Sequence, residues 1–197
     1  MKKLVATLAL FVFAGAASAQ MAEVAISGGL SALTNNVLGS LSGTTTGGDD
    51  LSLENGFRMA FRFTLNPQTF FGHEIGYAYN RTTLKYQSSS SSNAGMAIHQ
   101  GFYNFLVYAT PEGSRIRPFA TGGVHFSNFV PPGASVSSGQ GTNKMGFNYG
   151  GGVKLKLTNL FGIRVDLRQY QTGKPFDLGG TGLLHQTEVS AGLSIRL

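Results

Sequence analysis

Residues 147–170 read FNYGGGVKLKLTNLFGIRVDLRQY and carry the clearest hairpin pattern of the chain. On both sides of Thr158-Asn159, apolar residues alternate with charged residues or glycines. Because successive side chains of a β-strand point to opposite faces, this alternation predicts two strands joined by a tight turn. One face of the hairpin is apolar and the other is charged. A soluble sheet buries its apolar face, whereas a membrane barrel turns that face toward lipid and gathers the charges inside.

The first 19 residues, MKKLVATLALFVFAGAASA, have the layout of a secretory signal peptide. Two lysines precede an apolar stretch from Leu4 to Ala17, and Ala17-Ser18-Ala19 fits a cleavage site. The alternative to a cleaved signal peptide is a retained membrane anchor, but the apolar stretch is short for a membrane span. We therefore expect export, cleavage after Ala19 and a single barrel domain over residues 20–197.

The composition excludes several functional classes. The chain has no cysteine, which excludes disulfides, thiolate metal sites, a lipoprotein anchor and a cysteine nucleophile. The formal charge is +6, but the basic residues are spread over alternate strand positions, so we expect no nucleic-acid partner. The four histidines show no metal-ligand spacing, so neither a metal nor a cofactor is expected.

Eight segments show the alternation of a strand. The clearest is residues 56–65, where five large apolar residues alternate with Arg58, Ala60, Arg62 and Thr64, a pattern that does not fit a helix. The predicted strands are residues 22–33, 56–65, 70–81, 96–109, 117–129, 147–157, 160–170 and 185–197. The connections between them are long at residues 34–52, 82–95, 131–143 and 171–183 and short at residues 66–68, 111–114 and 158–159.

Long and short connections alternate in an up-and-down meander when all the short turns lie at one end. Both ends of the chain then lie on the short-turn side. Transmembrane barrels have this arrangement and an even number of strands, and each predicted strand is long enough for a tilted bilayer span. The sequence therefore predicts an all-β fold, an eight-stranded antiparallel up-and-down transmembrane β-barrel in the cell outer membrane.

In such a barrel the charged residues of the strands lie inside, where eight strands leave only enough width for side chains to fill. Buried charges are tolerated when they are paired, so we expect a salt-bridged plug centred on Glu74, Asp166 and Glu188. The alternative is a narrow ion path, as in a small porin-like channel. The predicted interior network consists of Arg58, Arg62, Glu74, Lys154, Lys156, Arg164, Asp166, Arg168, Glu188 and Arg196.

Aromatic residues near strand ends are typical of the girdles at membrane interfaces. In a soluble exported barrel resembling a lipocalin or avidin, the facing would be reversed, with Phe57, Phe61 and Ile163 inside. The predicted girdle comprises Phe70, Phe71, Tyr77, Tyr79, Phe161 and Tyr170.

The leader, the eight alternating segments and the strands FNYGGGVKLKL and FGIRVDLRQY resemble the small outer-membrane β-barrel proteins typified by the OmpA membrane domain and OmpX. The resemblance implies a monomer that is inserted by the barrel assembly machinery and surrounded by outer-membrane lipid and lipopolysaccharide. It implies a structural or interaction role through the four long loops, whose partner is unknown. The chain departs from the pattern at Leu197, where such barrels commonly end in Phe or Trp, and it shows no peptidoglycan-binding domain.

His125, Ser127 and Asn128 lie in the string HFSN, which resembles the His-x-Ser-Asn motif of lipid A deacylase barrels. That resemblance implies that His and Ser act with a Glu while Asn supports an oxyanion hole. Three predicted strands follow the motif here, however, and no Glu occurs between Glu112 and Glu188. Because a triad without its third group is incomplete, we expect a protein that is not an enzyme, with a deacylase-like esterase as the alternative.

Overall fold

The computed structural model describes residues 21–40, 50–87, 92–136, 139–176, 178–179 and 182–197. The predicted leader and most of the serine run at residues 88–92 lie outside these ranges. The described residues form ten strands: β1 Met21–Thr34, β2 Val37–Ser40, β3 Asp50–Leu53, β4 Gly56–Asn66, β5 Phe71–Gln87, β6 Ser92–Tyr108, β7 Ile116–Val130, β8 Thr142–Lys156, β9 Phe161–Gly173 and β10 Leu183–Arg196. No helix among them is long and apolar enough to cross a membrane.

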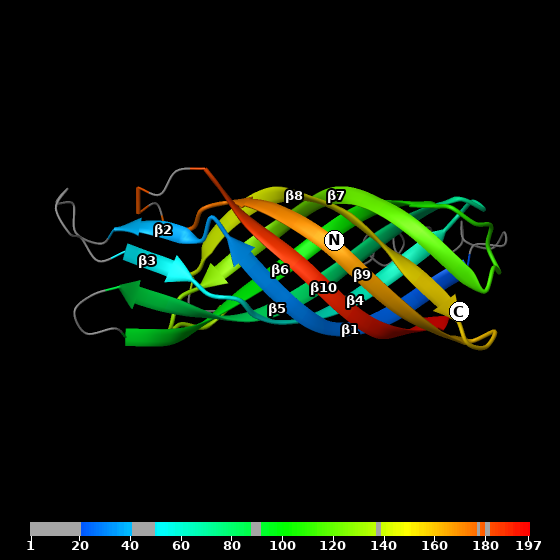
Figure 1. The fold of residues 1–197 in the computed structure, drawn as a ribbon, viewed down its shortest axis with the longest axis horizontal. Helices are drawn as coiled ribbons and strands as arrows, with labels where there is room; N and C mark the ends of the chain where they lie inside the picture. Colours follow the sequence, from blue (N-terminus) through cyan, green and yellow to red (C-terminus); the bar gives the residue numbers. More distant parts are fainter. Residues whose placement is uncertain (1–20, 41–49, 88–91, 137–138, 177, 180–181) are drawn as a thin grey trace, which may run out of the picture.

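Eight of these strands close into an antiparallel barrel in the order β1-β4-β5-β6-β7-β8-β9-β10, and β10 pairs back onto β1 (Figure 1). The short turns at residues 67–70, 109–115 and 157–160 define the turn end of the barrel, and the longer connections define the loop end. The backbone N–H of Leu197 donates to the carbonyl of Ala22 at 2.8 Å, so the described termini meet at the turn end. The predicted fold class is confirmed.

The hairpin that anchors the sequence interpretation is formed by β8 and β9, with Val153 opposite Val165 and Lys154 opposite Arg164. Its turn is stabilised by Thr158, whose side-chain oxygen accepts the backbone N–H of Phe161 at 2.9 Å. Hydroxyl side chains favour such turns because they satisfy backbone donors that leave the ladder.

Alternate residues of every barrel strand point inside and outside, as the sequence alternation requires. On β4, Phe57 is 49% exposed on the outer surface, whereas Arg58 and Arg62 are fully buried inside. On β10, Leu193 is 64% exposed, whereas Glu188 is fully buried. The outside is therefore apolar and the inside polar, which is the facing of a membrane barrel and the reverse of a soluble one.

Two predicted loops are wrong. Residues 34–52 contain β2 and the start of β3, and residues 82–95 contain the outer ends of β5 and β6, where Tyr86 lies opposite Ser92. β3 pairs with the outer part of β5, with Leu53 opposite Leu84. These segments have loop-like composition, but their inward leucines are buried together, and this tertiary packing outweighs weak local propensity.

We expect the folded chain to be heat-modifiable on a denaturing gel. A closed barrel leaves no free sheet edge in its wall, so detergent does not open it until it is heated. The measurement compares the mobility of unboiled and boiled protein taken from the outer-membrane fraction. A chain truncated before β10 lacks the closing strand and is the control, since its mobility should not depend on boiling. Identical mobilities for the full chain would contradict the closed barrel.

Candidate functional site

The middle of the lumen holds a cluster of four arginines and three carboxylates, each at most 1% exposed. We call it the charge cluster, and its members are Arg58, Arg62, Glu74, Arg164, Asp166, Arg168 and Glu188. Its arginines and acids come from β4, β5, β9 and β10, whose inward positions converge because the barrel is narrow.

One half of the charge cluster is built on β9, where Asp166 stands between two arginines on the same face. Arg164 donates to the two oxygens of Asp166 at 2.8 and 2.9 Å and to Glu74 Oε2 at 2.5 Å. Arg168 donates from Nη2 to Glu74 Oε1 at 2.8 Å and to Asp166 Oδ1 at 2.9 Å. Both carboxylates therefore bridge the same two guanidinium groups, which offsets the cost of burying them.

The other half is centred on Glu188 of β10. Arg58 Nε lies 3.0 Å from Glu188 Oε2, and Arg62 Nη2 lies 2.5 Å from Glu188 Oε1. The hydroxyl of Tyr170 donates to Glu188 Oε2 at 3.0 Å, and the Tyr170 ring lies 4.5 Å from the Arg58 guanidinium. Arg62 Nε lies 3.9 Å from Glu74 and so joins the two halves. Rings and charges thus fill the lumen together.

On the loop side of the charge cluster lies a layer of neutral polar side chains. Gln100 donates to Ser127 Oγ at 2.9 Å and to Gln186 Oε1 at 3.0 Å, and Gln186 donates to Ser31 at 2.7 Å. Asn80 accepts from Arg58 at 3.0 Å and connects this layer to the arginines. The network extends across strands that lie far apart in sequence, so the amide groups are satisfied without water.

On the turn side lies a second charged group that the sequence prediction included only through Lys154. Lys154 Nζ lies 3.0 Å from Glu23 and 3.1 Å from the hydroxyl of Tyr108. The guanidinium of Arg117 lies 3.4 Å from the Tyr108 ring centre and pairs with Glu112. The signal for Glu23 and Arg117 was present in the sequence, because both fall on the inward parity of their strands.

At the loop end, nine buried apolar side chains pack together inside the barrel mouth, with Phe176 and Leu178 packed against them. We call this group the apolar cap; its buried members are Leu33, Leu38, Leu51, Leu53, Leu84, Met96, Ile98, Phe129 and Leu184. The sequence analysis missed it, although inward parity at the loop ends of β1, β5, β6, β7 and β10 switches from polar to apolar residues and was the available signal.

A family model described as the outer membrane protein beta-barrel domain matches residues 4–196. The chain belongs to this family. The apolar outer surface of the barrel is therefore the surface that faces the outer membrane, and the charge cluster is shielded from lipid by the strands.

Solved outer-membrane barrels share the fold. Neisserial surface protein A is 12% identical, with a TM-score of 0.57, and the match covers 91% of this chain and 98% of that one. Ail, the attachment invasion locus protein of Yersinia pestis, is 12% identical over 90% of this chain and 99% of its own, with a TM-score of 0.51. The N-terminal barrel of Pseudomonas aeruginosa OprF is 12% identical over 90% and 97%, with a TM-score of 0.50. A comparison with curated protein sequences finds no match.

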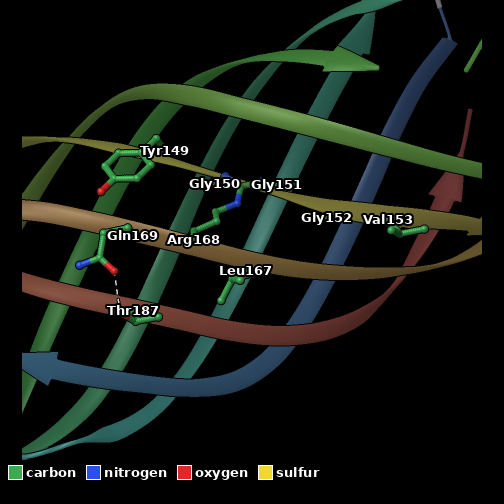
Figure 2. Close-up of a pocket in the computed structure, with 9 residues that line it drawn as sticks. All are labelled: Tyr149, Gly150, Gly151, Gly152, Val153, Leu167, Arg168, Gln169 and Thr187. Atoms are coloured by element: carbon green, nitrogen blue, oxygen red, sulfur yellow. Dashed lines mark hydrogen bonds between the residues drawn. The ribbon is translucent and has the colours of Figure 1, made fainter. Parts of the chain in front are cut away.

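The membrane-facing surface carries a shallow groove of about 580 Å³ over the glycines of β8 (Figure 2). Tyr149 and Val153 stand on either side of Gly151, and Leu167 lies opposite Gly151 on β9. At one edge Thr187 donates to the side-chain oxygen of Gln169 at 2.6 Å, so the polar groups of this edge satisfy each other. The groove is an apolar depression in the lipid-facing wall.

Three predicted members of the interior network lie apart from the charge cluster. Lys154 belongs to the turn-side group described above. Lys156 and Arg196 are half-buried at the turn end of β8 and β10, and no ion pair joins either of them to another residue in the described ranges. The other seven predicted residues are the members of the charge cluster.

The predicted aromatic girdle is wrong at Tyr170, which is fully buried in the lumen beside Arg58 and Glu188. It shares the inward parity of Arg164, Asp166 and Arg168, so parity and not nearness to the strand end decides its facing. Tyr77 and Tyr79 point outward but lie in the middle of β5 rather than near its end. Phe70, Phe71 and Phe161 are exposed at the turn end, where a girdle residue belongs.

The HFSN residues do not assemble into a catalytic arrangement. His125 Nε2 is hydrogen-bonded to Thr172 Oγ1 at 2.7 Å, and Ser127 Oγ accepts from Gln100 at 2.9 Å, so each is engaged with a different partner. Asn128 lies on the opposite face and donates to Asn143 at 2.5 Å. The described residues contain no group of three His, Cys, Asp or Glu side chains that could hold a metal ion.

We expect Asp166→Asn to destabilise the barrel by about 3–5 kcal/mol, because it leaves two buried guanidinium groups with one carboxylate fewer between them. Urea unfolding in detergent micelles, followed by far-ultraviolet circular dichroism, measures this loss. Leu167→Val on the adjacent outward position is the control and should change stability by less than about 1 kcal/mol. Equal stability of Asp166→Asn and the wild type would show that the bridging is dispensable.

Proposed function

We propose that this outer-membrane barrel acts by binding a partner at its loop end, and that it serves as an interaction protein rather than a channel or an enzyme. The observation that carries the proposal is a small sheet that continues beyond the barrel wall at the loop end. We call it the projecting sheet; it comprises β2, β3, residues 82–87 of β5 and residues 92–96 of β6 (Figure 1).

The projecting sheet has an unpaired edge within the described residues. Residues 92–96 pair with β5, but pairing of β6 with β7 begins only at Ala97, which lies opposite Val130. The backbone N–H of Tyr108 donates to Phe70 on the β5 side, and that of Ala109 donates to Pro118 on the β7 side. Because amide directions alternate along a strand, the N–H groups of odd-numbered residues point toward the open edge.

An open edge of this kind recognises an extended peptide segment, which adds as a further strand through backbone hydrogen bonds. The backbone N–H groups of Asn93 and Gly95 are the donors on this edge, and both residues are exposed. The partner class that this chemistry favours is a protein with an exposed extended segment. The Arg81 guanidinium lies over Gly95 on one face of this strand.

The contents of the lumen support a non-conducting role. The charge cluster fills the middle of the barrel with paired side chains, and the apolar cap packs inside its loop end. An ion that crossed both layers would have to separate buried salt bridges and then pass a group of leucines, and each step is costly. The separate engagement of His125 and Ser127 likewise supports a role without hydrolysis.

This role requires the loop end to face the outside of the cell. In the proposed biogenesis the leader is removed after Ala19, the barrel assembly machinery inserts the chain as a monomer, and outer-membrane lipid and lipopolysaccharide surround its wall. The structure of Ail was determined with the heparin analogue sucrose octasulfate, and a barrel of this size that takes a ligand supports a binding role for the fold.

The test uses the full chain in lipid nanodiscs and a displayed library of extended peptides. Asn93→Pro removes an N–H from the open edge. It removes no bond to β5, because the N–H of Asn93 points away from β5, and proline is tolerated at such positions of edge strands. We expect peptides that bind the wild type to bind Asn93→Pro about tenfold more weakly or worse, since main-chain hydrogen bonds supply the affinity of strand addition. Asn93→Ala keeps the N–H and is the matched control, with binding unchanged.

Binding that is equally strong in Asn93→Pro would exclude the open edge of the projecting sheet as the site. A gel shift on heating establishes in each case that the barrel has folded.

We also expect no steady conductance from the wild-type barrel in planar bilayers, because paired charges and the apolar cap fill the path. A steady current that changes in Arg58→Ala or Arg168→Ala would establish the channel instead. The same variants in nanodiscs, assayed for peptide binding, separate a lumen effect from an effect at the projecting sheet.

A further inference from the structure

Arg81, the last residue of β5 before the projecting sheet, places a positive charge on the outer face of the strands. Its side chain is exposed, and it forms no ion pair with an acidic side chain of the described ranges. Lys85, which shares this face of β5, is paired with Glu54. The charge of Arg81 is therefore available to a partner, whereas that of Lys85 is already matched within the chain.

The guanidinium of Arg81 lies over the neighbouring strand β6 at Gly95. A Cβ atom built on Gly95 would stand 2.8 Å from Nη2 of Arg81 and 3.4 Å from its Cζ. Arg81 is opposite Ala97 in the register, so its side chain leans toward the projecting sheet and reaches the edge strand itself. Gly95 makes room for the guanidinium, because it has no side chain on its outer face.

Gly95 also offers a backbone N–H to the open edge. In an antiparallel ladder the N–H and the C=O of one residue point to the same neighbouring strand, so Gly95 exchanges two hydrogen bonds with the residue opposite it on an added strand. Residues directly opposite each other carry their side chains on the same face, with Cβ atoms about 5 Å apart. The side chain opposite Gly95 therefore lies beside the Arg81 guanidinium, which covers the face of the strand and leaves the backbone groups of the edge free.

We propose that the open edge of the projecting sheet selects an extended segment that carries Asp or Glu opposite Gly95, and that Arg81 determines this preference. The preference rests on the proposed function, since it concerns the partner of the same edge. A carboxylate at that position accepts charge-assisted hydrogen bonds from the guanidinium. A Lys or Arg there would meet a like charge and be disfavoured.

The same charge opposes pairing of this edge with a second copy of the chain. Two β6 edges that paired antiparallel about Gly95 would bring two Arg81 guanidinium groups together on one face, and like charges at facing positions destabilise a sheet. Charged side chains on edge strands are a common protection against such self-association. The edge thus favours an acidic segment of another protein over its own kind.

The experiment identifies the peptide residue opposite Gly95 and its preferred chemistry. A displayed library of randomised peptides is selected on the wild type and on Arg81→Gln, both in lipid nanodiscs. The chain has no cysteine, so Asn93→Cys introduces a single thiol that forms a disulfide with a peptide cysteine directly opposite it. On an antiparallel peptide, the residue facing Gly95 comes two positions before that cysteine. We expect Asp and Glu to be enriched there on the wild type and not on Arg81→Gln.

One selected peptide and its counterpart with Asn or Gln in place of the acid then measure the effect. On the wild type the acidic peptide should bind about two- to fivefold more tightly, which is the range of an exposed ion pair, and the ratio should fall as salt is raised. On Arg81→Gln the two peptides should bind equally. Gly95→Ala should also lower the ratio, because its methyl group displaces the guanidinium while the backbone N–H is kept.

Lys85→Gln removes an equal charge from the same face and is the matched control. Its ratio should equal that of the wild type, because Lys85 is already paired with Glu54. A ratio that falls equally in Lys85→Gln and Arg81→Gln would reduce the effect to net charge and reject the role of Arg81. The gel shift on heating establishes that each variant has folded.

Two further outcomes separate this preference from the proposed function. Equal binding of the acidic and amide peptides by the wild type, or an acid preference that Arg81→Gln retains, would overturn the role of Arg81. If Asn93→Pro still weakens binding of the same peptides, the open edge stands as the site. Peptide binding that Asn93→Pro leaves unchanged would overturn the edge and the acid preference together.

Discussion

The bridging of Arg164 and Arg168 by Asp166 and Glu74 is the interaction on which the rest of the structure depends. A strand wall surrounded by lipid must turn its apolar residues outward, and its charged residues then have only the lumen to occupy. An eight-stranded lumen is too narrow to solvate them freely, so they must solvate each other. Closure of the barrel and neutralisation of its arginines are therefore one event, and neither is favourable alone.

The lumen changes character along its axis in a way that fits this demand. The charged side chains, which are the most costly to expose to lipid, occupy the middle of the lumen, where the wall is deepest in the membrane. Neutral amides lie between them and the loop end. The apolar cap follows, formed partly by leucines of β2 and β3 that do not belong to the barrel wall. The cap thus ties the projecting sheet to the barrel, which holds the sheet in one orientation for a partner.

The same narrowness supports recognition at the loop end. A filled lumen leaves the loop end as the surface available for recognition, and among the described residues the open edge of β6 offers unpaired backbone donors there.

The alternation of apolar and polar residues with a period of two determined most of the fold of this protein. From it alone follow the eight strands, the inward set Arg58, Arg62, Glu74 and Asp166 and the outward set headed by Phe57, because parity on a strand is a local property of the backbone. Only the tertiary structure decided which charges pair, that Tyr170 bonds to Glu188 and that His125 bonds to Thr172, because these contacts depend on the stagger between strands far apart in sequence. It also decided the structure of Val37–Ser40 and Asp50–Leu53: the composition of this region predicts a loop, but Leu38, Leu51 and Leu53 form part of a strand pair because they pack at the barrel mouth.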